Sequence, residues 1–160
     1  MATYQVNGNQ ATVTSSPKGS AGLWTSTAAG LRRLKIYEFD IGATGVPNAT
    51  DCNITIDLSR LTYTSLLVGT VYVANPTDPA DGAANALVNI NITTEVAANS
   101  VSTATPEYHN GMNQRNTIRW VAAQESQFLI SAATTLVGHY MTVTSPNYGS
   151  SISTNIYYLE

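Results

Sequence analysis

Apolar and polar side chains alternate along most of this 160-residue chain, and a period of two residues is the signature of β-strands. The clearest case is CNITIDL, residues 52–58, where four apolar side chains alternate with three polar ones. Such a segment places its apolar side chains on one face, as a half-buried strand requires. Because the alternation dominates from residue 31 onward, the sequence predicts an all-β fold.

Eight segments carry this pattern, separated by short links rich in Gly, Pro, Asn and Ser. They are residues 31–41, 52–58, 61–75, 86–96, 116–123, 126–131, 136–145 and 150–159. The first segment is mixed: Tyr37, Phe39 and Ile41 share one phase, whereas Leu34 and Ile36 fall in the other. Eight short strands with such links predict an antiparallel sandwich or a barrel.

The first thirty residues lack a strong strand pattern and are dominated by small polar side chains. We therefore expect an extended N-terminal arm, residues 1–30, ahead of a β-sandwich domain, residues 31–160. Large aromatic side chains on such an arm need a surface to dock on, which makes Tyr4 and Trp24 candidate contacts with another subunit. Two long irregular segments, 75–86 and 96–114, are expected to be contact loops.

Charge and composition exclude several classes of partner. Only 11% of residues are charged, against an average near 25%, and the net charge is −3. We therefore expect no nucleic-acid partner.

No segment looks like a signal peptide or a membrane span, so we expect synthesis in a cytoplasm, no membrane partner and no glycosylation. The single cysteine, Cys52, cannot form an internal disulfide and is expected to be a small buried side chain.

Catalytic and metal-binding motifs are not recognisable in the sequence. The histidines, His109 and His139, have no partner suggested by spacing, and a lone strand histidine is usually a packed or interface residue. Residues 75–82 hold two aspartates close together, but successive turns capped by aspartate side chains explain this stretch as well as calcium does. We therefore expect neither an enzyme nor a cofactor or metal.

Residues 113–130, NQRNTIRWVAAQESQFLI, place two arginines beside a tryptophan in this weakly charged chain. A ligand platform, a catalytic anion site and one wall of a sandwich are all compatible with that composition. Alternation favours the third interpretation, because Trp120 shares a face with Ile118 and belongs inside. Arg115 and Arg119 then lie on the exterior or at a subunit contact.

Four sequence blocks resemble a family of small virion proteins of tailed bacteriophages, common in phages of cyanobacteria and other aquatic bacteria. The blocks are LRRLKIYEFDIG (31–42), NPTDPAD (75–81), NQRNTIRWVAA (113–123) and SPNYGSSISTNIYYLE (145–160). Relatives in that family often carry Pro-Gly in the turn after the third block, where this chain has Gln124, Glu125 and Ser126. The first thirty residues match less well.

The resemblance implies a jelly-roll-type β-sandwich that acts as a capsid decoration or cement protein. Such a protein lies on the outer capsid surface, staples adjacent major capsid protein subunits and forms a homotrimer suited to three-fold lattice positions. Arg32 and Arg33 precede the first confident strand and are the expected docking residues, because capsid exteriors of this kind are commonly acidic. The alternative is a carbohydrate- or receptor-binding jelly-roll module on a phage capsid or tail fibre.

Overall fold

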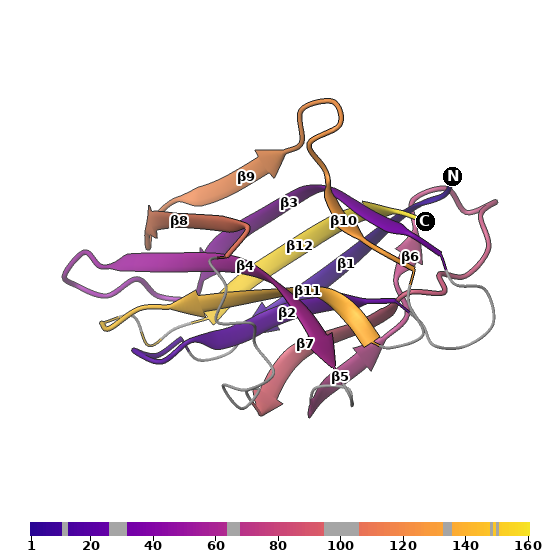
Figure 1. The fold of residues 1–160 in the computed structure, drawn as a ribbon. Helices are drawn as coiled ribbons and strands as arrows, with labels where there is room; N and C mark the ends of the chain where they lie inside the picture. Colours follow the sequence, from indigo (N-terminus) through magenta and orange to yellow (C-terminus); the bar gives the residue numbers. More distant parts are fainter. Residues whose placement is uncertain are drawn as a thin grey trace.

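The computed structural model describes residues 1–10, 13–25, 32–63, 68–94, 106–132, 136–147, 149 and 151–160. The described residues form twelve strands (Figure 1). The strands are β1 (Thr3–Gln10), β2 (Lys18–Trp24), β3 (Leu34–Thr44), β4 (Asn53–Tyr63), β5 (Val68–Tyr72), β6 (Asn75–Pro76), β7 (Leu87–Thr94), β8 (Tyr108–Asn113), β9 (Thr117–Val121), β10 (Phe128–Ile130), β11 (Leu136–Thr144) and β12 (Ser151–Leu159). No helix in this part of the chain has the length and apolar character needed to cross a membrane.

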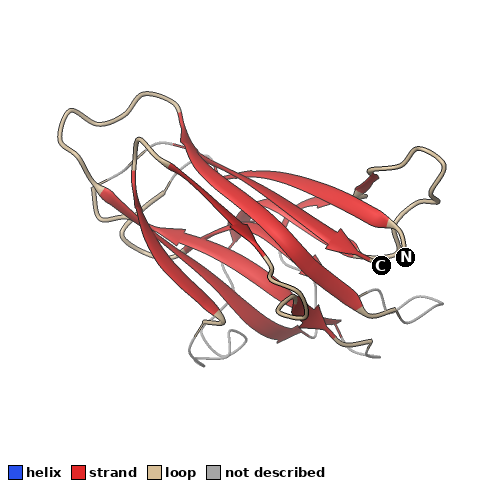
Figure 2. Cartoon of the chain, turned by 90° about the horizontal axis from the view of Figure 1, so that it is seen from above, coloured by secondary structure: helices blue, strands red, loops and turns tan. Residues whose placement is uncertain are grey.

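The strands form two six-stranded sheets that lie face to face (Figure 2). Sheet A has the order β10-β3-β12-β1-β6, with β9 also paired to β3, and sheet B has the order β5-β7-β2-β11-β4-β8. Every pairing is antiparallel. The predicted all-β sandwich is therefore confirmed.

Strands β1, β2 and β8 lie outside the eight predicted segments, and the twelve strands occupy fewer positions in the two sheets. Strands β9 and β10 both pair with β3, one beside residues 38–42 and the other beside residues 34–36. They make one edge strand that is interrupted by the loop 122–127, which projects from the molecule in Figure 1. Strands β5, β6 and β7 lie between β4 and β8 in the chain and extend the sheets at β1 and β2. Eight strand positions remain, four in each sheet.

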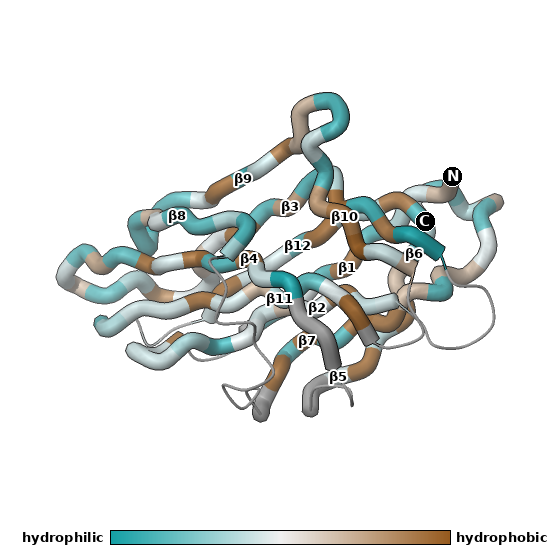
Figure 3. Tube along the Cα trace, in the orientation of Figure 1, coloured by the Kyte–Doolittle hydropathy of each residue, from teal (hydrophilic) through white to brown (hydrophobic). Residues whose placement is uncertain are grey.

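The core lies between the sheets and takes alternate residues from most strands. Hydrophobic and hydrophilic residues alternate along several of these strands in Figure 3. In β4 the side chains of Ile54, Ile56 and Leu58 are fully buried, as the sequence predicts. In β12 buried and half-buried residues alternate without exception. Burying one apolar side chain contributes about 1.5–3 kcal/mol, so these faces fix the register of both sheets.

The mixed phase at the start of residues 31–41 is explained by a β-bulge. Tyr157 pairs with Glu38, but its neighbour Tyr158 pairs with Ile36, which leaves Tyr37 as the extra residue on β3. A bulge shifts the alternation by one residue. Residues on either side of it, such as Ile36 and Phe39, can then both face the core, whereas Tyr37 does not share the face of Phe39 as the sequence suggested.

The expected N-terminal arm is replaced by two strands of the sandwich. Strand β1 pairs with β12 along its whole length, and β2 lies between β7 and β11 in the middle of sheet B. The sequence of β2, KGSAGLW, has low strand propensity because it contains lysine, two glycines and an alanine. Small residues are required there, since a Cβ at Gly19 would overlap the Tyr140 ring. Residues 11–12 and 26–30 of the expected arm lie outside the described residues.

The predicted loops are only partly irregular. The predicted loop 75–86 begins with β6, which pairs with β1. At its other end, the Asn85 main-chain N–H donates to the two Glu160 carboxylate oxygens at 3.0 and 3.1 Å. The chain termini meet at the same end, where Ala2 and Glu160 exchange main-chain hydrogen bonds (Figure 1). Within the segment 96–114, β8 forms the edge of sheet B, and residues 96–105 lie outside the described residues.

Candidate functional site

The outer face of sheet A carries polar side chains in register across four strands. One row joins Arg119 on β9, Asp40 on β3, Asn155 on β12 and Asn7 on β1. The next row joins Glu38, Tyr157 and Gln5. We call these seven residues together with Tyr37 the polar platform. Because neighbouring strands lie about 4.8 Å apart, the platform presents a polar group at each strand spacing.

Hydrogen bonds between neighbouring strands hold the platform side chains in place. Asn155 Nδ2 donates to Asp40 Oδ1 at 2.7 Å, and Arg119 Nε donates to Glu38 Oε1 at 2.6 Å. The Glu38 side chain is only 16% exposed, whereas that of Arg119 is 66% exposed. The arginine therefore covers the carboxylate and keeps its own outer edge toward solvent. The outward position of Arg119 and the inward position of Trp120 are as the alternation predicts.

Two tyrosines border the carboxylates of the platform. The rings of Tyr37 and Tyr157 lie 6.4 Å apart and are tilted by 46°. Burial, together with the charges of Asp40 and Glu38, raises the pKa of Tyr157, and burial together with Glu38 raises that of Tyr37. Both phenols are therefore neutral near pH 7. The Tyr157 hydroxyl also accepts a hydrogen bond from Gln5 Nε2 at 3.3 Å.

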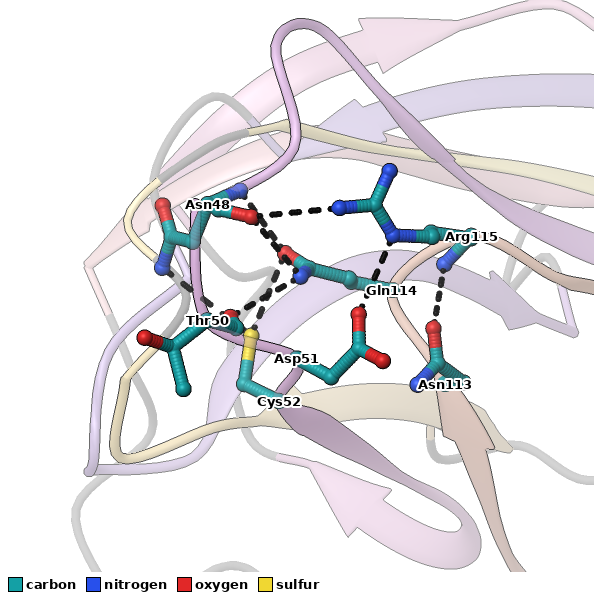
Figure 4. Close-up of polar contacts among 7 residues, drawn as sticks. All are labelled: Asn48, Thr50, Asp51, Cys52, Asn113, Gln114 and Arg115. Carbon is teal, nitrogen blue, oxygen red and sulfur yellow. Dashed lines mark hydrogen bonds and ion pairs between the residues drawn. The ribbon is translucent and has the colours of Figure 1, made fainter.

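A second polar cluster fixes the loop between β3 and β4 (Figure 4). Gln114 is 2% exposed, and its Nε2 donates to the carbonyl oxygens of Thr50 at 3.0 Å and Asn48 at 3.2 Å. Its Oε1 accepts from the Asn48 main-chain N–H at 2.9 Å and from the Cys52 thiol at 3.3 Å. One amide thus satisfies four loop groups. Cys52 is buried, as expected, and the adjoining surface hollow is lined by Asn48, Ala49, Thr50 and Asn147.

Arg115 is exposed, as expected, but it lies in the turn before β9 and not within the strand. Its Nε donates to Asp51 Oδ1 at 3.0 Å (Figure 4). The hydrogen bonds from Arg115 and Gln114 lower the pKa of Asp51. Both side chains of the pair are more than half exposed, and the pair lies on the solvent side of the Gln114 cluster.

Arg32 and Arg33 are exposed immediately before β3. Neither makes an ion pair with any described residue, in contrast to Arg60, Arg115 and Arg119, each of which contacts a carboxylate. Lys35, half-buried on β3, follows them without an ion pair in the described structure. We call Arg32, Arg33 and Lys35 the basic edge.

Tyr4 and Trp24 do not lie at the surface, contrary to our expectation. Tyr4 is 2% exposed, stacks on Tyr158 with ring centroids 5.4 Å apart and donates its hydroxyl to the Gly82 carbonyl oxygen at 3.1 Å. Trp24 is 1% exposed and donates Nε1–H to Asn89 Oδ1 at 3.2 Å. Their strands belong to the sandwich, so both aromatics pack within the domain.

The histidines form carboxylate pairs that sequence spacing could not indicate. His139 is buried, and its Nε2 lies 2.5 Å from Glu107 Oε2, while Arg60 lies 2.7 Å from the other Glu107 oxygen. Among the described residues, the Nδ1 atom of His139 has no hydrogen-bond partner. Burial lowers the pKa of His139 despite the opposing effect of Glu107. His109, on β8, contacts Asp57 at 2.5 Å on the outside of sheet B.

Metal-ligating side chains do not gather in the described parts of the chain, where no three His, Cys, Asp or Glu side chains come together. In the acidic loop, Asp78 Oδ1 accepts a hydrogen bond from the Ala80 main-chain N–H at 2.9 Å. The Asp81 main-chain N–H donates to the Asp78 carbonyl oxygen at 3.0 Å. This is the turn chemistry that the sequence suggested as one explanation of residues 75–82.

Comparisons of this chain with protein-family models, with curated protein sequences and with solved structures find no significant match.

Proposed function

We propose that this chain is a structural virion protein of a tailed bacteriophage. In this proposal it decorates the outer capsid surface as a homotrimer and staples adjacent major capsid protein subunits. The four sequence blocks that resemble phage virion proteins support the proposal. The observation that carries it is the basic edge: Arg32 and Arg33 are exposed and make no ion pair with described residues, whereas three other arginines contact carboxylates.

The strand order supports the jelly-roll type of sandwich that the resemblance implies. We number the eight strand positions in chain order, counting β9 and β10 as one position and leaving out β5–β7. The positions then follow the order 6-3-8-1 in sheet A and 2-7-4-5 in sheet B. Jelly rolls are double sheets of eight strands built from two Greek keys, and they occur in viral capsid and lectin domains. The same order would fit a decoration protein or a sugar-binding module, so the fold alone does not choose between them.

The basic edge suits contact with an acidic capsid surface. Free guanidinium groups can form charge-assisted, bidentate hydrogen bonds with carboxylates, and this gives a docking edge both orientation and affinity. Arginines already committed to internal carboxylates, such as Arg119 with Glu38, would have to give up a contact first. Three copies of a weak edge in one trimer would multiply the affinity without further contacts.

The test is binding to undecorated capsids at low and moderate salt. Arg32→Ala with Arg33→Ala should leave the melting temperature of the free protein nearly unchanged. Capsid binding should weaken by about 2–5 kcal/mol if the contact is desolvated. The double variant Arg115→Ala with Arg119→Ala, which also removes two cations, is the matched control.

Identical isotherms for the basic-edge variant and the wild type at both salts would exclude this edge. A loss confined to the control variant would move docking to the outer face of sheet A and the Gln114 loop. Failure of the wild-type protein to bind capsids in many copies, or to raise their heat stability, would overturn the decoration function itself.

A further inference from the structure

The polar platform is not used by docking through the basic edge, and its composition differs from that of a protein interface. Interface centres are depleted of charged side chains and rich in large apolar contacts. The rows Arg119-Asp40-Asn155-Asn7 and Glu38-Tyr157-Gln5 instead combine amide, carboxylate and hydroxyl groups. Such a surface offers many hydrogen bonds and little apolar area to bury.

Donors and acceptors on the platform are fixed before any ligand arrives. Asn155 is held by Asp40 at 2.7 Å, and Gln5 Nε2 donates to Asn7 Oδ1 at 2.9 Å. An amide whose orientation is set by a neighbour loses less conformational entropy when it binds. Each carboxylate and amide oxygen can accept a further hydrogen bond, and the Asn7 and Asn155 amides have N–H donors to spare. The platform is therefore preorganised for a ligand with many hydroxyl groups.

Charge selects a neutral ligand. The single cation Arg119 is opposed by the two carboxylates of Glu38 and Asp40, and its Nε is already bonded to Glu38. An anionic ligand would meet an excess negative charge, while a hydroxyl group can donate to a carboxylate and accept from the guanidinium. The half-buried rings of Tyr37 and Tyr157 add an amphipathic surface at the same place, with a ring face and a hydroxyl.

We propose that the polar platform binds a neutral oligosaccharide that lies across the strands of sheet A. The strand spacing of about 4.8 Å is comparable with the length of one sugar ring, so successive rings along a row meet side chains of successive strands. Asp40, Asn155 and Asn7 hydrogen-bond the sugar hydroxyls, and Tyr157 contacts the apolar face of a ring. This binding activity is independent of capsid docking through the basic edge.

The experiment is a titration of the 15N-labelled protein, followed by amide chemical shifts, with cellohexaose, maltohexaose and hexagalacturonate as separate probes. At least one neutral hexasaccharide should shift amides of β1, β3 and β12 with a Kd of about 1 mM or lower. The acidic hexagalacturonate should bind more weakly than that neutral probe. Asn7→Ala with Asn155→Ala should weaken binding by about tenfold or more.

The control is Asn85→Ala, which removes an exposed amide that is not part of the platform, in the loop before β7. It should bind the neutral probe as the wild type does. Thermal melts of both variants confirm that they fold. If the double variant does not fold, the single variant Asn155→Asp is tested instead. This change keeps the side-chain size and removes the amide donor, and it should also lower the affinity for the neutral probe.

Three outcomes would overturn the proposal. They are the lack of shifts with all three probes, shifts that map to residues outside sheet A, and preferred binding of hexagalacturonate. Platform shifts produced by major capsid protein and by none of the saccharides would also overturn it and would assign this face to a protein contact. The capsid-binding assay is separate, so each proposal can fail while the other stands.

Discussion

Trp24 and Gly138 are partners across β2 and β11, and the indole lies over the position where a side chain at residue 138 would be. A Cβ at Gly138 would overlap both the Trp24 ring and the Leu23 main-chain oxygen. On the other side of the indole, a Cβ at Gly22 would come within 2.5 Å of Trp24 Cζ2. The tryptophan thus occupies space that two glycines leave free on the outer side of sheet B.

Gly138→Ala should therefore destabilise the domain by about 1–3 kcal/mol or more, since the main-chain oxygen of Leu23 cannot move aside as a flexible side chain can. Chemical denaturation measures the change. Gly82→Ala is the control, because no atom lies near the Cβ that it would add. Equal stability of Gly138→Ala and Gly82→Ala would show that Trp24 does not lie over Gly138.

Trp120 supports a second prediction about the edge of sheet A. Its ring stacks on Phe39 at 5.2 Å and contacts Phe128 at 4.6 Å between centroids. Trp120→Ala should cost about 3 kcal/mol, the lower end of the range for emptying a large aromatic site, because the side chain is half-buried. Val121→Ala, at a neighbouring residue that is 53% exposed, should cost less than about 0.5 kcal/mol. Similar losses for the two variants would contradict the inward position of Trp120.

The alternation of side chains predicted the strands whose faces differ in polarity. Cys52, Ile54, Ile56 and Leu58 are all buried, as their period of two residues requires. Strand β2 was missed because its glycines and alanine provide neither bulk nor polarity contrast. The role of the two glycines depends on Trp24 and Tyr140, aromatic rings that cover them, and contacts of that kind are not visible in a local pattern.

The candidate sites were predictable only where they lie within one strand. The outward position of Arg119 follows from its place beside Trp120, but the row that joins it to Asp40 and Asn155 depends on the pairing of three strands. The pair of His139 and Glu107 likewise joins residues 32 positions apart. Spacing along the chain carries no information about such contacts.

His139 should make stability depend on pH in the mildly acidic range. Burial keeps the pKa of His139 in the folded protein below its ordinary value of 6.5. Below pH 6.5 the unfolded chain therefore binds a proton that the folded chain does not, and stability falls as the pH is lowered toward the folded-state pKa. His139→Gln, which keeps a donor for Glu107, should show a smaller loss over that range. The check is the unfolding free energy measured at several pH values, and equal slopes for both proteins would contradict the assignment.

Glu125 has a backbone conformation that favours glycine. Its φ angle is 67°, and it is the third residue of a turn closed by a hydrogen bond of 3.0 Å from the Ser126 N–H to the Ala123 carbonyl oxygen. Glu125→Gly should raise the stability by up to about 1 kcal/mol, because glycine adopts this conformation without steric cost. Glu125→Gln controls for the lost charge and should have little effect. Gln124→Gly should instead lower the stability, since the φ angle at that position is not in the left-handed region. A thermal melt of each variant measures these changes, and a lower melting temperature for Glu125→Gly would contradict the turn geometry.

Gln114 should be the most sensitive polar residue in the loop cluster. Its amide bonds two main-chain oxygens, one main-chain N–H and the Cys52 thiol, and it is buried (Figure 4). Gln114→Leu keeps most of the volume but leaves those groups without their partner, and each buried unsatisfied group costs about 1–3 kcal/mol. We expect a loss of at least about 2 kcal/mol in a denaturant titration. Gln114→Glu should also destabilise the domain, because a carboxylate would face the carbonyl oxygens of Asn48 and Thr50 and has no N–H to donate. Thr50→Ala is the control, since only the main-chain oxygen of Thr50 contacts Gln114. A loss for Gln114→Leu no larger than that of Thr50→Ala would mean that the 48–52 loop is held by contacts other than this amide.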